Sequence, residues 1–296
     1  MIKDTLRNEI NALLDLLDDP DSSVYESVYK RFMQIGPATS EILEDALSMS
    51  LDDGYQKRIE YILDDISKNH ALNLSENWLQ NNPDDILEGY LIFTRYQYPN
   101  LNTEEIINQV EALRINIWME LNENLTALET VRIINHILFK VHRFEKDTAE
   151  ISNPKYNYLN QVLQSKIYTH CSIALLYLIL TKKLELPIKG VLYKGSPILC
   201  YVNDINKKTE EIVYKDVLFY IDPYNFGNVI PKDILKEIGS TILPLNNPKE
   251  MLPVVPSELI LKTIYSTALS EKENDNHKKS EDLMYFHSLL KTMSEK

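Results

Sequence analysis

Cys171 and His170 are adjacent in the sequence, and they are the residue types that thiol enzymes use as nucleophile and base. They precede the apolar run 173–180, so both stand at the expected start of a buried helix. The positive end of a helix lowers the pKa of a thiol and favours the reactive thiolate. Successive residues of a helix point about 100° apart, however, so this thiol and this imidazole are not expected to hydrogen-bond. Cys171 is therefore either a nucleophile with another base or a small apolar residue of the helix core.

Asp222 is the carboxylate best placed to orient a catalytic base, because it follows an apolar run at the end of an expected strand. An aspartate before Pro223 also starts a turn without any catalytic role, and both interpretations stay open. Cys200 lies between Leu199 and Tyr201 in another expected strand, which predicts a buried apolar residue.

Metal and phosphate sites are not predicted. The six histidines, at positions 70, 136, 142, 170, 277 and 287, show none of the paired spacings of zinc ligands. Two cysteines are too few for a metal cluster or a disulfide framework. Seven scattered glycines supply no glycine-rich phosphate loop, so no cofactor is expected.

The elements that would position these residues change character near Pro154. The patterns predict a short helix over 157–163, an apolar helix over 171–184, and β-type runs over 187–193, 198–202 and 212–221. A polar loop over 203–211 and a turn over 222–227 separate and end these runs. The residues after 231 are predicted to be helical, with a mobile charged loop over 271–280.

The first 70 residues predict a set of amphipathic helices. Ser22 or Ser23 is expected to cap the second helix, and Gly36 is expected to end it. The spacing of apolar residues over 19–36 is similar to a HEAT-type repeat, whose paired helices stack into a scaffold. A plain four-helix unit is the alternative.

Residues 84–145 continue the helical pattern. Thr126 and Glu129 have the spacing of a capping box that opens one of these helices. Trp118 belongs to the apolar face of another, so its ring is expected to be buried. Along the chain, helices are followed by a helix with antiparallel strands and then by further helices. This order predicts an α+β fold.

Charge and hydropathy limit the possible partners. With 31 basic and 44 acidic residues the formal net charge is −13, which disfavours nucleic acid and anionic membrane surfaces. The densest basic pairs, Lys207-Lys208 and Lys278-Lys279, are flanked by acids. The longest apolar run has 8 residues, against the roughly 20 that a membrane span requires. With no signal peptide expected at Met1, a cytoplasmic protein is predicted.

Several spaced motifs occur in one order along residues 80–290. They are Asn153-Pro154, Asn157-Tyr158-Leu159-Asn160, Leu186-Pro187, Gly190-Val191, and Asp222-Pro223-Tyr224-Asn225 with Gly227. This set resembles a bacterial branch of the transglutaminase-like superfamily, the Bacteroidetes-type branch with a helical N-terminal half. The resemblance implies a papain-like core in which one buried helix packs on a small antiparallel sheet.

Active members of that superfamily carry a Cys-His-Asp triad. Counting back from Leu186-Pro187 places the family's cysteine position at His170, one residue before Cys171. The family's histidine position falls on Ser196, and its aspartate position on Asp222. A serine cannot replace imidazole as a base near pH 7, so the resemblance implies a degenerate triad.

Two functions remain from this sequence. The preferred one is a non-catalytic transglutaminase-like protein that binds a protein or peptide partner. The alternative is a thiol hydrolase or acyl transferase that uses Cys171. The expected organisation is a HEAT-like segment over 1–70, a helical domain over 71–150, the α+β core over 151–245, and C-terminal helices over 246–296.

Overall fold

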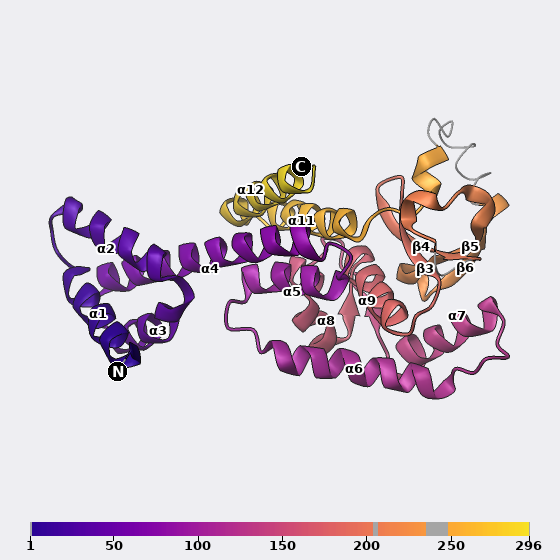
Figure 1. The fold of residues 1–296 in the computed structure, drawn as a ribbon, viewed down its shortest axis with the longest axis horizontal. Helices are drawn as coiled ribbons and strands as arrows, with labels where there is room; N and C mark the ends of the chain where they lie inside the picture. Colours follow the sequence, from indigo (N-terminus) through magenta and orange to yellow (C-terminus); the bar gives the residue numbers. More distant parts are fainter. Residues whose placement is uncertain (1, 204–206, 235–247, 296) are drawn as a thin grey trace. The chain divides into compact units, whose positions relative to one another are not determined.

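The computed structural model describes residues 2–203, 207–234 and 248–295. Two compact units divide the chain, Met1–Leu74 and Ser75–Lys296 (Figure 1). Each unit has its own hydrophobic core, so each is described by itself.

The first unit is helical. Its elements are α1 (Ile2–Leu16), α2 (Ser22–Ile35), the 3-10 turn η1 (Gly36–Thr39), α3 (Ser40–Met49) and the start of α4 (Asp53–Asn81). Apolar residues at helical spacing form its core, and the fully covered ones are Ile10, Leu14, Leu17, Val28, Phe32, Leu43, Ile59, Ile62 and Ile66. The amphipathic pattern therefore predicts these helices correctly, whereas a HEAT-type repeat remains a prediction.

The cap of α2 differs from the expected one. Asp21, rather than Ser22 or Ser23, is the N-cap, and its carboxylate accepts a hydrogen bond from the Ser23 amide at 2.8 Å. An aspartate caps as well as a serine does, and its charge also favours the helix N-terminus. Gly36 ends α2 as expected, with a φ of 70°.

Helices dominate the second unit. They are α5 (Ile86–Gln97), α6 (Thr103–Glu120), α7 (Ala127–Asn135) with the π-helical turn η2 (His136–Val141), α8 (Leu159–Ser165), α9 (His170–Lys183), α11 (Pro256–Glu273) and α12 (His277–Ser294). Short 3-10 turns join several elements: η3 (Pro154–Asn157), η4 (Thr209–Glu211), η5 (Tyr214–Asp216), η6 (Pro223–Asn225) and η7 (Pro248–Met251). The capping box predicted for Thr126 and Glu129 is present at the start of α7.

The strands of this unit form an antiparallel sheet in the order β3 (Ile188–Tyr193), β4 (Ser196–Val202), β5 (Val217–Asp222) and β6 (Asn228–Pro231). A separate parallel pair of two-residue strands joins β1 (Glu145–Lys146) to β2 (Ile167–Tyr168), directly before α9. In Figure 1 the four-stranded sheet lies beside the end of α9.

Helix α9 is the centre of the unit. All its residues from Cys171 to Thr181 are buried, and it packs against β3 and β4 as well as α5, α6, α8 and α11. A Cβ at Gly190 of β3 would lie 2.3 Å from Leu259 and 3.1 Å from Leu178, so this glycine lets the sheet approach both helices. The predicted α+β architecture, with one buried helix on an antiparallel sheet, is confirmed.

Three expectations about element bounds are wrong. The β-type run predicted from 212 starts at Val217, because residues 214–216 form a 3-10 turn directly before the strand. Strand β6 was not expected, since four residues ending in a proline carry too weak a strand pattern. The loop predicted over 271–280 is reduced to the short connection between α11 and α12, because both helices continue into the charged segment. Residues 204–206 of the predicted polar loop lie outside the described residues.

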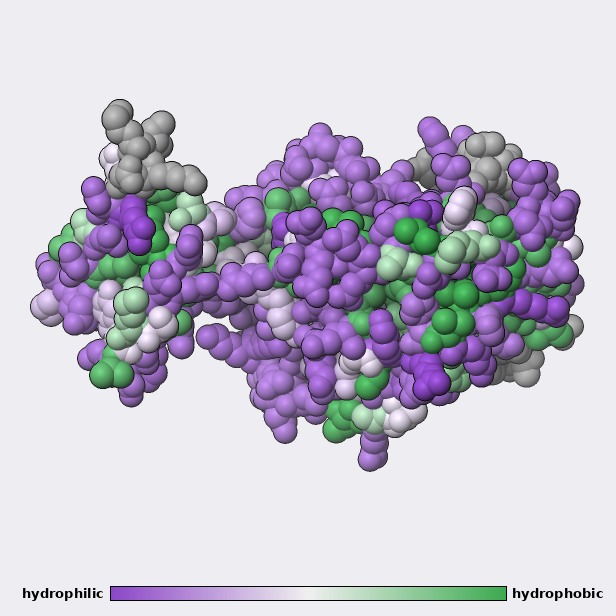
Figure 2. All heavy atoms as spheres, turned by 90° about the horizontal axis from the view of Figure 1, so that it is seen from below, coloured by the Kyte–Doolittle hydropathy of each residue, from purple (hydrophilic) through white to green (hydrophobic). Residues whose placement is uncertain are grey.

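Trp118 is also not where its helical spacing placed it. Its ring is 61% exposed, whereas Ile117 beside it is fully buried. The large buried indole is Trp78, which is 1% exposed and donates from Nε1 to the Asp85 carbonyl at 2.9 Å. Figure 2 shows that hydrophobic residues appear on one face as separate spots among hydrophilic ones.

Candidate functional site

The N-terminus of α9 is fixed by a buried capping box. Thr169 is the N-cap, its hydroxyl oxygen accepts from the Ser172 amide, and the Ser172 hydroxyl accepts from the Thr169 amide at 2.9 Å. The Thr169 hydroxyl also donates to the Asn157 side chain. Because these groups are buried, they hold the first turn of α9, with His170 and Cys171, in one orientation.

His170, the predicted cysteine position of the family, lies flat against Tyr224. The ring centroids are 3.4 Å apart and the ring planes differ by 16°. The side chain is exposed on its other side. Partial burial lowers the pKa of His170, Asp222 opposes this change, and the charge of Lys146 adds to it.

Asp222 ends β5 and caps the 3-10 turn that follows. Its carboxylate accepts from the Asn225 amide at 3.3 Å and from Asn225 Nδ2 at 2.7 Å. The turn interpretation of Asp222-Pro223 is therefore correct. Asp222 is close enough to His170 to influence the pKa of that imidazole, although no hydrogen bond joins the two side chains in the described part of the chain.

Ser196, the predicted histidine position of the family, is exposed at the start of β4. It follows a tight turn in which Lys194 and Gly195 have φ values of 49° and 75°. Along a strand alternate residues share a face, so Ser196 is on the face of Ile198 and Cys200. Those two side chains belong to a small core with Tyr220 and not to the α9 side of the sheet. Within the described residues, Ser196 hydrogen-bonds neither His170 nor Asp222.

Cys171 points away from His170 and toward α11. Its thiol is 5% exposed and donates to Ser266 Oγ at 3.5 Å. Burial raises the pKa of Cys171, and hydrogen bonding with Ser266, the charge of Lys262 and hydrogen bonding with Thr263 only partly oppose this. Burial therefore outweighs the helix-start effect expected from the sequence. Among the described residues no imidazole hydrogen-bonds this thiol.

Cys200 is buried as the sequence predicts. It is 0% exposed in β4, and burial raises the pKa of its thiol to about 12. Such a thiol stays protonated and unreactive near neutral pH.

A cluster of aromatic rings, part of it buried and part of it exposed, surrounds His170, and sequence reasoning missed it. We call the set Phe139, Tyr168, His170, Tyr224 and Phe226 the α9 aromatic cluster. Neighbouring rings in it are in edge or tilted contact, with centroids between 5.7 and 6.2 Å apart, apart from the stacked pair described above. The rings come from η2, β2, α9 and the turn after β5, so no local sequence pattern could have brought them together.

Lys146 adds a cation to the α9 aromatic cluster. Its Nζ lies 5.4 Å from the ring centroid of Tyr224 and 5.7 Å from that of Phe226, both within cation–π range. The Phe226 ring is 48% exposed. The cluster therefore presents an apolar, cationic and imidazole surface to solvent at the start of α9.

The described residues contain no group of three or more histidine, cysteine, aspartate or glutamate side chains arranged to hold a metal ion. None of the described helices combines the length and the apolar character needed to cross a membrane.

Known proteins provide an independent comparison. Two relatives are each called "UPF0162 protein" and come from Xylella fastidiosa strains 9a5c and Temecula1. The first is 22% identical over 196 residues, which cover 64% of this chain and 66% of the relative. The second is 22% identical over 152 residues, which cover 51% of this chain and 50% of the relative. The chain thus spans between half and about two thirds of the length of these relatives. No solved structure matches.

The family comparison covers most of the second unit. The model of the transglutaminase-like superfamily matches residues 104–264, more than half of the chain. This range contains His170, Cys171, Ser196 and Asp222 together with α9 and the whole four-stranded sheet. This chain belongs to the transglutaminase-like superfamily.

Proposed function

We propose that this protein is a non-catalytic member of the superfamily that binds a peptide segment at the α9 aromatic cluster. One observation carries the proposal. The thiol of Cys171 is buried against Ser266, while the neighbouring imidazole of His170 stacks on Tyr224. A thiol enzyme requires an imidazole within hydrogen-bond reach of its thiol, and no imidazole of the described residues hydrogen-bonds Cys171.

The family positions support the same proposal. An imidazole stands at the position of the nucleophile, and an exposed serine stands at the position of the base. A serine hydroxyl does not accept a proton near pH 7, so Ser196 cannot activate a thiol or a water molecule. Asp222 has the residue type of the family's aspartate, but its carboxylate accepts hydrogen bonds from the amide and the side chain of Asn225.

The α9 aromatic cluster has the features of a peptide-binding surface. Its exposed members are Phe226 and His170, whereas Phe139 and Tyr168 are buried beneath them. An exposed aromatic ring beside a cation is typical of the residues that dominate binding energy at interfaces. Phe226 offers a surface for an apolar side chain, and Lys146 beside it favours a carboxylate. The expected ligand is therefore a segment with an aromatic or long aliphatic residue next to an acidic one.

A selection on the full chain tests this function. Peptides selected from a random displayed library would be titrated calorimetrically against the wild type and Phe226→Ala. We expect Phe226→Ala to weaken binding about tenfold or more, since truncation of a central aromatic residue commonly has this effect. Tyr285→Ala is the matched control, because Tyr285 is a 63% exposed aromatic residue on α12 and lies outside the cluster.

Two outcomes would overturn the proposal. One is that all selected peptides bind Phe226→Ala and the wild type equally. The other is rapid labelling of Cys171 by iodoacetamide at pH 6, since only a thiol with a strongly lowered pKa reacts under these conditions. That result would favour the thiol hydrolase or acyl transferase instead.

A further inference from the structure

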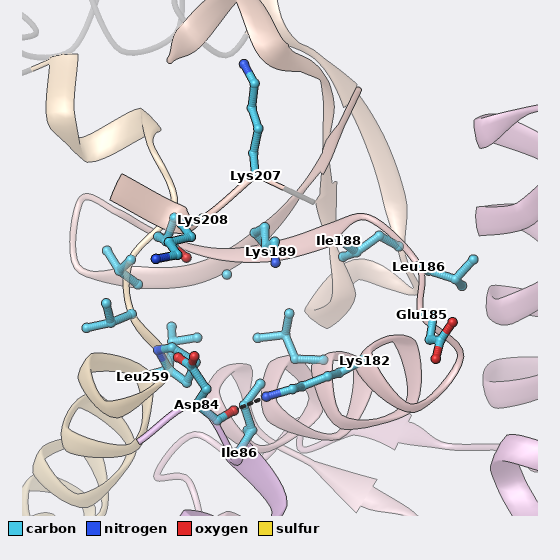
Figure 3. Close-up of a pocket in the computed structure, with 16 residues that line it drawn as sticks. Asp84, Ile86, Lys182, Glu185, Leu186, Ile188, Lys189, Lys207, Lys208 and Leu259 are labelled. Atoms are coloured by element: carbon cyan, nitrogen blue, oxygen red, sulfur yellow. Dashed lines mark hydrogen bonds between the residues drawn. The ribbon is translucent and has the colours of Figure 1, made fainter. Parts of the chain in front are cut away.

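A second concave site lies at the opposite end of α9 from the α9 aromatic cluster. It is a cavity of about 660 Å³ between the C-terminal half of α9, β3 and the starts of α5 and α11 (Figure 3). Lys182 on its wall is 12 residues after His170, which corresponds to roughly 18 Å along the helix axis. The cavity is therefore separate from the family's triad positions.

The floor of this cavity is aliphatic. Ile86, Leu178 and Leu259 line it from three different helices, and each is at most 4% exposed. Val254, Val255 and Pro256 extend the apolar wall toward the surface. These residues offer no polar side-chain group, so the floor suits an aliphatic body and not a sugar or a nucleotide base.

The rim of the cavity is basic, in contrast to the chain as a whole. Four lysines and two acids line it, a local excess of two positive charges in a chain of net charge −13; they are Lys182, Lys189, Lys207 and Lys208 with Asp84 and Glu185. In the sequence Lys207 and Lys208 are merely a basic pair beside acids. The fold places them on the rim of the same cavity as Lys182 and Lys189.

Two of the four lysines already have partners. Lys207 forms an ion pair with Asp216 at 2.6 Å, and Lys182 donates to the main-chain oxygen of Asp84. Figure 3 shows Lys207 extending away from the other lining side chains and Lys182 reaching across to Asp84. Lys189 and Lys208 form no hydrogen bond or ion pair through their side chains with the residues that the structure describes. These two ammonium groups are the ones available to an anionic ligand.

We propose that this cavity binds an aliphatic carboxylate, with the hydrocarbon on the floor and the carboxylate beside Lys189 and Lys208. The volume is within the range of small-ligand sites, roughly 300–1,000 Å³. A monovalent carboxylate matches the available charge, and its apolar body matches the floor. Two sources share this chemistry, a free fatty acid of medium length and a peptide C-terminus that ends in an aliphatic residue. This proposal does not depend on the proposed function, because the two sites share no residue.

A ligand series on the wild-type chain tests the chemistry without any substitution. Isothermal titration would compare octanoate with octanol and octylamine, and octanoate with butyrate. We expect saturable binding of octanoate, weaker binding of octanol and none of octylamine. From butyrate to octanoate the affinity should rise about fourfold for each added methylene group, until the floor is covered. Equal binding of octanol and octanoate, or no saturable binding of octanoate, would overturn the proposal.

Substitutions then locate the site. Lys189→Met combined with Lys208→Met keeps the aliphatic stems and removes both charges, and we expect octanoate affinity to fall by about tenfold or more. Lys272→Met is the matched control, because it removes one exposed lysine of α11 outside the cavity. Phe226→Ala should leave octanoate binding unchanged, which separates this test from that of the peptide site. Unchanged affinity in a folded double variant would show that the cavity is not the site.

The two sources are distinguished by a last pair of titrations. An acetylated pentapeptide ending in leucine would be compared with its C-terminal amide and with octanoate. Tighter binding of the free-acid peptide than of octanoate assigns the site to a chain terminus, and the reverse order assigns it to a free fatty acid. If the amide binds as tightly as the acid, the carboxylate is not recognised and the proposal fails.

Discussion

The thiol of Cys171 lies beneath α11, where burial raises its pKa. Cys200 is buried as well, and the pKa of its thiol is also raised. We therefore expect both thiols of the native chain to react with iodoacetamide at pH 7 far more slowly than the same thiols in urea. Peptide mapping by mass spectrometry follows each site, and the unfolded chain is the internal control. A thiol that reacts as fast in the native chain as in urea would contradict this.

The substitution Cys171→Ala tests whether this thiol contributes to stability or to peptide binding. The change removes one sulfur atom from a buried helix start, so the free energy of unfolding should fall by less than about 2 kcal/mol. Peptide binding at the α9 aromatic cluster should not change.

Substitution of Gly227 is expected to destabilise the fold more than substitution of Cys171. Its φ is 70°, and a Cβ there would lie 1.9 Å from Asn135 Oδ1. Asn135 cannot easily move, because its Nδ2 donates to the Gly227 carbonyl at 2.7 Å and its Oδ1 accepts from the Tyr177 hydroxyl at 3.2 Å. Gly227→Ala should therefore lower the free energy of unfolding by about 3 kcal/mol or more, since it adds backbone strain and breaks this network.

Gly195 provides the matched control for Gly227. Its φ is 75°, but a Cβ there would meet no atom within 4 Å. Gly195→Ala should cost only the backbone strain of a left-handed residue, roughly 1–2 kcal/mol. Urea denaturation of the two variants measures the difference, and equal destabilisation would mean that the Asn135 network contributes nothing.

The assignment of the family's triad positions to His170, Ser196 and Asp222 stays a prediction from the spacing around Leu186-Pro187. The sequence leaves open whether Cys171 is a nucleophile or a buried apolar residue, and the structure shows that it is buried. The α9 aromatic cluster could not be predicted, because its rings come from four elements whose contacts depend on tertiary packing. The same reason applies to the cavity lysines.

At the scale of elements, the start of α9 depends on Thr169. The hydroxyl of this residue serves both the Ser172 amide and the Asn157 side chain, and all three residues are buried. Thr169→Ala should lower the free energy of unfolding by roughly 1–2 kcal/mol, the upper part of the range for a lost N-cap. The same substitution at the exposed capping box of α7, Thr126→Ala, should cost less, about 0.5–1 kcal/mol. The reverse order of the two variants in chemical denaturation would contradict this.

Helical periodicity identified most helices but not every buried face. Trp118 was expected to be buried because it was assigned to the same apolar face as Ile117, yet its ring is exposed and Ile117 is the core residue. Neighbouring helical residues differ by about 100° in direction, so one position decides between core and solvent. Trp78 was not singled out, since its burial depends on the glycine at position 89, whose Cβ would lie 2.4 Å from the indole.

The strands were predicted where the apolar runs are long. β3 and β4 match the expected runs closely, and β5 starts later because residues 214–216 form a 3-10 turn directly before it. β6 carries too few apolar residues to be recognised alone. It forms because it pairs with β5, with Ile221 opposite Val229. Pairing of this kind is a tertiary effect that no local pattern reports.

At the scale of the whole molecule, three histidines link stability to pH. Burial lowers the pKa of His142, His170 and His287, and nearby Lys166, Lys146 and Lys291 add to this effect. A lowered folded-state pKa means that the unfolded chain binds more protons, so the free energy of unfolding rises with pH. This contribution is complete above the unfolded value of about 6.5 and is lost as the pH falls through the folded-state pKa values.

We therefore expect the melting temperature to decrease as the pH falls from about 7.5 to 5.5. The melting temperature of the His142→Gln variant should decrease less steeply over this pH range than that of the wild type. Its ring Nε2 lies 2.9 Å from Asn116 Nδ2, a contact in which the neutral ring can accept and the protonated ring cannot. Burial raises the pKa of Glu258, which acts in the opposite direction at lower pH, nearer 4.5. A melting temperature that is constant or rises from pH 7.5 to 5.5 would contradict this prediction.

The burial of α9 from Cys171 to Thr181 has a consequence for the lifetime of its amide protons. The helix is covered by the sheet and by four other helices, so no small local opening exposes its interior. The main-chain amides of its buried part should then exchange in heavy water only when the whole second unit opens, so that all give the same free energy of opening. The protium that remains in α9 after days would therefore measure the global stability of that unit, without any denaturant.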